Sequence, residues 1–175
     1  MKTFKTLAEM AALVGQEVAV SDWITITQEQ VNQFADATGD HQWIHVDVER
    51  AKKGPFGAPI AHGYLTLSLL PKFFDSALRV EQVGMGVNYG LNRVRFMAPV
   101  PVGSKVRGRL KLVKSDPIDN NGQQMTWEVT VEIEGGVDDP ERVRPGLLVD
   151  EDRDLDLTCR DHVNVQARVG QRRGG

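Results

Sequence analysis

Apolar and polar residues alternate one by one along several stretches of the second half of the chain. Residues 125–134 show this most clearly, because Thr and Glu separate five apolar positions: Met125, Trp127, Val129, Val131 and Ile133. The segment "KVRGRLKLV" likewise puts Val106, Leu110 and Leu112 on one face, and "VNYGLNRVRFM" is typical of a strand with a glycine bulge. A period of two indicates half-buried antiparallel strands with one apolar face and one solvent-facing face.

The first half of the chain has helical periodicity instead. Apolar residues recur every three or four positions from Leu7 to Val14, and Gly15 is placed to end that helix. "TQEQ", which starts at Thr27, matches a capping box, so it predicts a helix that Gly39 ends. Between them "EVAVSDWITI" predicts a strand with a break near "SD", and "VDVERAKKG" predicts a short helical turn.

A long apolar stretch, "HGYLTLSLLPKFFDSAL", lies between these helices and the later strands. It is apolar on nearly every side, which predicts a buried helix. Pro71 predicts a kink or a boundary within it, because proline cannot continue a helix unperturbed. Helices followed by consecutive strands indicate an α+β fold, in which a curved antiparallel sheet wraps the long helix.

Composition limits the classes of partner. Hydrophobic residues make up 41% and charged residues 26% of the 175 positions, and the formal net charge is −3. That balance favours neither nucleic acid nor an anionic membrane as a partner, and no apolar run approaches the ~18 residues of a membrane span. A single cysteine, Cys159, rules out an internal disulfide and fits a reducing, cytoplasmic location.

The composition changes sharply near residue 136. All 6 Phe, 3 Trp and 2 Tyr precede residue 128, and an Arg- and Asp-rich segment follows. We therefore expect one domain at 1–136 and an atypical tail at 137–175, since such a segment buries little. Within the tail, "HVNVQARV" alternates like a strand. The tail is predicted either to supply one strand to the sheet or to be disordered.

Two stretches hold the candidate chemistry. The first, "GDHQWIHVD" (39–47), contains two of the 4 histidines. His41, His45 and Asp47 could form a metal site of the pattern H-x3-H-x-D, although zinc usually takes three or four ligands of fixed geometry. Alternatively Asp40 and His45 form an acid–base pair, or the stretch is a solvated polar loop. The spacing alone leaves all three open.

The second stretch is "PIAHGY" (59–64), in which Gly63 comes at the start of the long helix. The first N–H groups of a helix have no helical partner, and glycine lets a ligand approach closely. Such a donor is suited to a developing oxyanion. The other interpretation is an ordinary helix start, with His62 bonded to the backbone.

"FADATGDHQWIHVDVERA" followed by "PIAHGYLTLSLLP" resembles the MaoC-like hydratases, the (R)-specific enoyl-CoA hydratase group, in particular the nodulation protein N-like branch. The resemblance covers residues 5–135 and includes "RVRFMAPVPVGSKV". It implies a hot-dog fold, with a central helix wrapped by an antiparallel sheet. Many members have Asn-Pro where this chain has Gln42 and Trp43, and its tail has no counterpart in the family.

The resemblance also implies an activity. It is the reversible hydration of a trans-2-enoyl-CoA to the (R)-3-hydroxyacyl-CoA, a hydro-lyase reaction of fatty-acid metabolism without metal or organic cofactor. It makes Asp40 and His45 catalytic and Gly63 oxyanion-binding, and the expected substrate contacts are Gln42, Trp43, His62 and Tyr89. The substrate is an acyl-CoA or acyl carrier protein thioester, and the expected state is a homodimer. The rivals are a hot-dog acyl-CoA thioesterase and a non-catalytic acyl-thioester binding protein.

Overall fold

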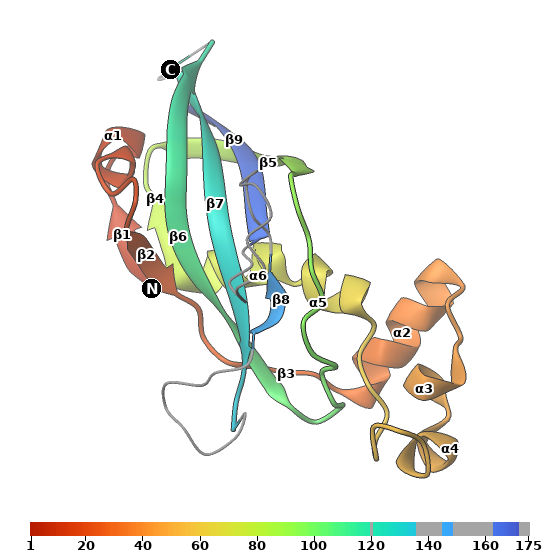
Figure 1. The fold of residues 1–175 in the computed structure, drawn as a ribbon. Coiled ribbons are helices and arrows are strands. Elements are labelled where there is room, and N and C mark those ends of the chain that lie inside the picture. The colour runs from red at the N-terminus through yellow and green to blue at the C-terminus, as the bar shows by residue number, and fades with distance from the viewer. Residues whose placement is uncertain (120, 136–144, 149–162, 172–175) are drawn as a thin grey trace.

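The computed structural model describes residues 1–119, 121–135, 145–148 and 163–171 (Figure 1). Its helices are α1 (Leu7–Ala11), α2 (Gln28–Thr38), α3 (Trp43–Val46), α4 (Val48–Lys52), α5 (Gly63–Ser68) and α6 (Leu70–Ala77). Its strands are β1 (Lys2–Phe4), β2 (Glu17–Val20), β3 (Ile24–Thr25), β4 (Leu78–Val80), β5 (Val83–Leu91), β6 (Lys105–Ile118), β7 (Gly122–Ile133), β8 (Pro145–Leu148) and β9 (Val163–Gln171).

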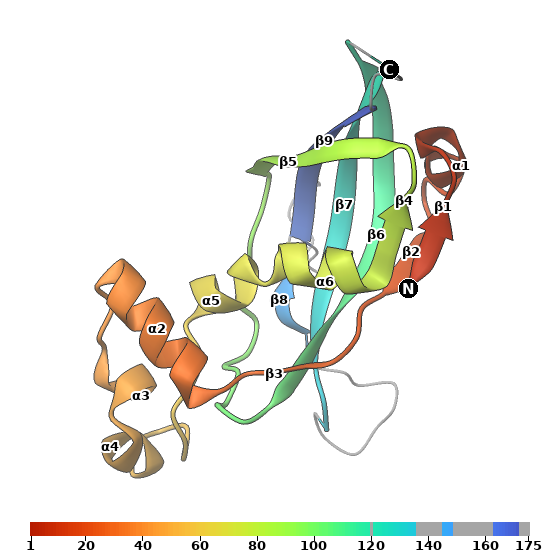
Figure 2. The same cartoon turned by 180° about the vertical axis from the view of Figure 1, so that it is seen from behind.

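One antiparallel sheet makes up the body of the molecule. Its strands lie in the order β2-β6-β7-β9-β5, with β3 added beside β6 and β8 beside β7. The short strands β1 and β4 form a separate parallel pair. In Figure 2 the helix α6 crosses one face of the sheet, α5 continues from it beside the sheet, and α2, α3 and α4 gather beyond the beginning of α5. The expected α+β hot-dog fold, a helix wrapped by an antiparallel sheet, is confirmed.

The central strands have the apolar faces that their sequences predict. Val106, Leu110 and Leu112 of β6 are fully buried, and so are most of the alternate apolar residues of β7: Met125, Trp127, Val129 and Val131. The prediction of a solvent-facing opposite face is partly wrong, because Glu132 is only 4% exposed. Its carboxylate binds Arg107 Nε at 2.6 Å and Arg109 Nη1 at 3.3 Å, and these ion pairs compensate the burial of its charge.

The strand predicted from "VNYGLNRVRFM" is shifted. β5 begins earlier, at Val83, and ends at Leu91, with an irregular register between Asn88 and Gly90. The chain beyond it leaves the sheet and then pairs with the segment before α5, since Ala61 N–H donates to Val100 O and Val102 N–H donates to Pro59 O. This detour brings residues 96–100 to the beginning of α5.

The long apolar stretch forms two helices that meet at Leu69, and Pro71 lies in the first turn of α6. The prediction of a boundary near Pro71 is confirmed. Phe73 is fully buried against the sheet, where a Cβ on Gly108 would lie 3.1 Å from it. The apolar stretch that forms α5 and α6 is not buried all round, because only one side of it faces the sheet. Its other side is exposed at several positions: Tyr64, Ser68, Pro71, Lys72 and Asp75.

The remaining N-terminal predictions hold with one change of boundary. α1 ends at Ala11, before Val14, and Gly15 turns the chain with φ +87° and donates its N–H to Leu112 O. The predicted strand is broken between β2 and β3, near Ser21.

Residues 163–169 of the segment "HVNVQARV" lie in β9, which pairs with both β5 and β7. Apart from β8 and β9, the tail residues, with Cys159 and His162 among them, lie outside the described residues. Among the helices of the described residues, none combines the length and the apolar character that crossing a membrane requires.

Candidate active site

Asp40 is placed by the end of α2. The helix begins at a capping box, in which Thr27 Oγ1 accepts from Gln30 N–H while Gln30 Oε1 accepts from Thr27 N–H. It ends at Gly39, whose φ of +78° lies in the left-handed region that glycine adopts without strain. Asp40 follows immediately on the loop, and its side chain is 55% exposed.

His45 lies on the short helix α3 and is 6% exposed. Its Nδ1 is 2.6 Å from Ile60 O. Because a carbonyl oxygen only accepts, Nδ1 carries the proton, and Nε2 of the neutral ring is an acceptor. The backbone of His45 is also held, since Gln28 Nε2 donates to His45 O at 2.8 Å.

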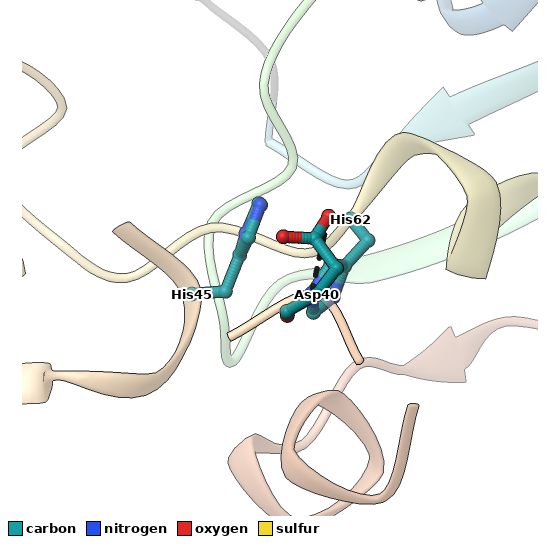
Figure 3. A group of neighbouring side chains, drawn as sticks. All are labelled: Asp40, His45 and His62. Carbon is teal, nitrogen blue, oxygen red and sulfur yellow. Dashed lines mark hydrogen bonds and ion pairs between the residues drawn. The ribbon is translucent and has the colours of Figure 1, made fainter. Parts of the chain in front are cut away.

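His62 joins these two groups (Figure 3). It is 2% exposed and precedes α5, and its ring stacks on that of His45 with centroids 3.8 Å apart and planes at 26°. Its Nε2 donates to the backbone oxygen of Asp40 at 2.9 Å and is 4.0 Å from Asp40 Oδ2. His62 therefore ties the loop of Asp40 to the beginning of α5.

The environment of His45 favours the neutral ring. Burial lowers its pKa from the ordinary value of 6.5, and this effect outweighs the bond to Ile60 O, which raises the pKa. Nearby His62 lowers the pKa further, and Asp40 raises it. A neutral His45 with a free Nε2 can accept a proton at physiological pH.

A cavity of about 370 Å³ opens beside His45 and the first turn of α5. Its wall is mostly apolar and comes from four segments: His45 of α3, residues 56–61, α5 and residues 96–100. Gly63 lies in this wall, and Phe96 packs so closely on it that an added Cβ would be 2.8 Å from Phe96 Cδ1. As the first residue of α5, Gly63 has an N–H without a partner inside the helix.

The metal site suggested by H-x3-H-x-D is not assembled. His41 Nε2 faces Asp36 at 3.7 Å, and the carboxylate of Asp47 accepts from Arg50 N–H at 3.0 Å, which caps α4. The described residues instead bring ligand atoms of Asp40, His45 and His62 within 4.8 Å of one another. Two stacked rings aim their lone pairs along nearly parallel planes, so this trio is better suited to proton transfer than to a shared metal ion.

The four residues expected to contact the substrate lie outside the wall of this cavity. Neither Gln42 nor Trp43 is in the cavity wall: Gln42 is exposed, and Trp43 packs under Arg50 and against Gly54. Tyr89 is on β5 and is 53% exposed, and it too is absent from that wall, as is His62. Of the seven site residues expected from the sequence, the structure brings together Asp40, His45, His62 and Gly63.

Sequence reasoning missed three residues of the site. Phe96 was assigned to a strand, and its contact with Gly63 depends on the detour of the chain. Gln28 lies within the "TQEQ" segment, and its bond to the backbone of His45 depends on how α2 and α3 are arranged. Thr66, which lines the cavity, carried a signal that could have found it, because it is a hydroxyl residue within an otherwise apolar turn.

Comparison with known proteins identifies the family of this chain. A family model described as "MaoC like domain" matches residues 9–135. The 3-hydroxyacyl-thioester dehydratase Z of Mycobacterium tuberculosis (strain ATCC 25618 / H37Rv) is 57% identical over 135 residues, which are 77% of this chain and 89% of that protein. Nodulation protein N of Rhizobium leguminosarum bv. viciae is 50% identical over 131 residues, 74% of this chain and 81% of that protein.

Solved structures with the same fold are more distant in sequence. A MaoC-like dehydratase from Rhodospirillum rubrum superposes with a TM-score of 0.67 at 17% identity, over 95% of this chain and 97% of that one. An (R)-hydratase from A. caviae involved in PHA biosynthesis has a TM-score of 0.58 at 20% identity, over 91% and 96%. These two likenesses support the fold.

Proposed function

This chain belongs to the MaoC-like domain family and is a hydro-lyase of the hydratase and dehydratase class, and from that premise we propose that it hydrates trans-2-enoyl thioesters reversibly to (R)-3-hydroxyacyl thioesters. The observation that carries the proposal is the convergence of Asp40 and His45 beside a cavity that Gly63 lines. The similarity to 3-hydroxyacyl-thioester dehydratase Z supports the thioester class of substrate.

Water is held between the two catalytic side chains. The ligand atoms of Asp40 and His45 lie within 4.8 Å of each other, a separation that one water molecule can bridge with two hydrogen bonds of ~2.8 Å. Nε2 of His45 accepts one proton of the water, because Nδ1 is committed to Ile60 O. The Asp40 carboxylate accepts the other O–H and orients the oxygen toward the substrate.

Hydration then needs no reactant other than the substrate and this water molecule. The water oxygen bonds to Cβ as its proton passes to His45, and the electrons of the double bond move to the thioester oxygen to give an enolate. The Gly63 N–H donates to that oxygen, and removing such a donor typically costs about 10²- to 10³-fold in rate. The proton on His45 is then delivered to Cα, which regenerates the neutral ring.

The carrier and the stereochemistry are further parts of the proposal. We expect CoA or acyl carrier protein thioesters of fatty-acid metabolism as substrates. The (R) product follows if the water between Asp40 and His45 reaches only one face of the double bond.

A homodimer is also proposed, because β5 lies at an edge of the sheet and an unpaired strand edge is commonly covered by a second copy.

Two other functions remain as outcomes of the test. A thioesterase would direct the water at the thioester carbon and release a free thiol. A binding protein would leave the thioester unchanged. The bond from His45 Nδ1 to Ile60 O favours catalysis over simple binding, because it leaves Nε2 to take a proton, and the product then distinguishes the hydratase from the thioesterase.

The test is the loss of enoyl-thioester absorbance on adding the protein to crotonyl-CoA, with the Asp40→Asn variant alongside. We expect rapid loss with the wild type and a decrease of about 10²- to 10⁴-fold in Asp40→Asn. Asp36→Asn is the matched control, since Asp36 lies on α2, is exposed and faces His41. Coupling the product to an (R)-specific and then to an (S)-specific 3-hydroxyacyl-CoA dehydrogenase reads the stereochemistry.

Free thiol released without hydration would favour the thioesterase, and an unchanged thioester that nevertheless binds would favour the binding protein. Equal activity of Asp40→Asn and the wild type would remove Asp40 from the mechanism.

A further inference from the structure

Thr66 carries a buried hydroxyl that the mechanism above does not use. It is the fourth residue of α5 and is 1% exposed, and it is one of the residues of the cavity wall, as are His45 and Gly63. Four other side chains in that wall could form hydrogen bonds or stack: His45, Phe56, Tyr64 and Phe96. Tyr64 is 67% exposed, so its ring lies toward the mouth of the cavity. Thr66 is the buried hydroxyl of this wall.

Hydroxyl residues elsewhere in the helices are satisfied by a backbone carbonyl of the preceding turn. Thr38 Oγ1 donates to Phe34 O at 2.7 Å, Ser68 Oγ donates to Tyr64 O at 2.7 Å, and Ser76 Oγ donates to Phe73 O at 3.2 Å. Thr66 Oγ1 has no hydrogen-bond partner within the described residues. A buried polar atom without a partner costs free energy, so its retention calls for an explanation in function.

Position on the helix connects this hydroxyl to the proposed oxyanion donor. Gly63 and Thr66 are three residues apart, so they are neighbours on one face of α5. That face is the one that borders the cavity. A carbonyl oxygen that reaches the Gly63 N–H is therefore beside the side chain of Thr66.

We propose that the Thr66 hydroxyl donates a hydrogen bond to the thioester carbonyl oxygen of the bound acyl substrate, as a second oxyanion donor beside the Gly63 N–H. This inference rests on the proposed function for the identity of the ligand, an α,β-unsaturated acyl thioester. The bond already forms to the carbonyl of the bound thioester and strengthens as negative charge develops on that oxygen in the enolate, so it contributes to binding and more strongly to kcat.

Thr66→Val and Thr66→Ser test the proposal, because valine matches threonine in shape without the hydroxyl and serine keeps the hydroxyl. We expect Thr66→Val to lower kcat for crotonyl-CoA hydration by about 10²-fold, with Tm unchanged or higher since an unpartnered buried hydroxyl is removed. Thr66→Ser is expected to stay within about threefold of wild type, a change far smaller than the loss of one donor. Ser68→Ala, on the exposed side of α5, is the control and is expected to leave kcat unchanged.

A purely structural role for Thr66 predicts the reverse pattern, with Tm altered and kcat preserved. Thr66→Val with kcat within twofold of wild type would overturn the proposal. So would loss of activity that Thr66→Ser fails to restore.

Binding measurements separate this inference from the proposed function. Calorimetry compares butyryl-CoA, which has the thioester carbonyl, with S-butyl-CoA, a thioether that lacks it. We expect Thr66→Val to weaken binding of butyryl-CoA and not of S-butyl-CoA, whether or not the wild type hydrates crotonyl-CoA. Equal effects on the two ligands, or no binding of butyryl-CoA by the wild type, would overturn the inference.

Discussion

The rings of His45 and His62 stack with centroids 3.8 Å apart, and the ring of His62 is bonded through Nε2 to the backbone of Asp40. His45 is thus held on three sides: by Ile60 O at Nδ1, by Gln28 at its carbonyl oxygen and by His62 on one ring face. His62 is absent from the cavity wall and contacts both His45 and the backbone of Asp40, so we propose that it positions these two groups.

The bond from His62 to Asp40 is expected to matter for turnover and not for substrate binding. His62→Phe keeps an aromatic ring but removes the donor, whereas His62→Gln keeps a donor that can reach the Asp40 carbonyl. We expect His62→Phe to lower kcat by about 10-fold or more, since small misplacements of catalytic groups are costly, and His62→Gln to retain more activity. Steady-state kinetics on crotonyl-CoA would measure both variants.

The KM of both variants is expected to match that of the wild type. A raised KM with unchanged kcat would instead make His62 a substrate-binding residue. Full activity of His62→Phe would show that the bond to Asp40 has no role in positioning.

The pH dependence of hydration is expected to report the ionisation of His45. The neutral ring is the active form in hydration, so kcat/KM falls as pH drops through the pKa of His45. Because burial lowers that pKa from 6.5, the acidic limb is expected below pH 6.5. In His62→Gln the limb should move toward higher pH, since nearby His62 lowers the pKa of His45. A pH profile of kcat/KM in both proteins would check this, and a limb above pH 6.5 in the wild type would contradict it.

Gly63 is expected to tolerate no side chain while Phe96 is in place. The Cβ of Gly63→Ala would lie 2.8 Å from Phe96 Cδ1, closer than van der Waals contact, so the ring or the start of α5 must shift. We expect kcat/KM to fall by about 10²-fold, as displacement of an oxyanion donor implies.

The double variant Gly63→Ala/Phe96→Leu distinguishes the contact from the loss of glycine itself. It should recover part of the activity, measured against Phe96→Leu alone. No recovery would mean that the closeness of Phe96 does not explain the effect.

The capping box of α2 is expected to stabilise the helix that carries Asp40. Thr27→Ala removes the bond from Gln30 N–H to Thr27 Oγ1 and should lower the free energy of unfolding by about 1 kcal/mol. Thr27→Ser keeps the hydroxyl and should cost much less. Chemical denaturation of the three proteins would measure the difference. Equal stability of Thr27→Ala and wild type would show that the capping bond does not stabilise the protein.

Local patterns in the sequence determined most of the elements. The capping box at Thr27 and the glycine at position 39 set the ends of α2 through contacts within a few residues, and the alternation in β7 reports its buried face. Pro71 marked the boundary between α5 and α6, because the restriction is built into its own ring. Features of this kind depend on near neighbours, so they can be predicted without knowing the fold.

Tertiary structure alone decided which side chains meet. The stack of His62 on His45, the contact of Phe96 with Gly63 and the burial of Glu132 beneath Arg107 join segments that lie far apart in the sequence. The same holds for Tyr89, whose place on β5 keeps it out of the cavity wall. The path of the chain between elements sets these contacts, and no periodicity within one element records that path. The sequence by itself thus determined the elements and the candidate residues, and packing decided how those residues are arranged.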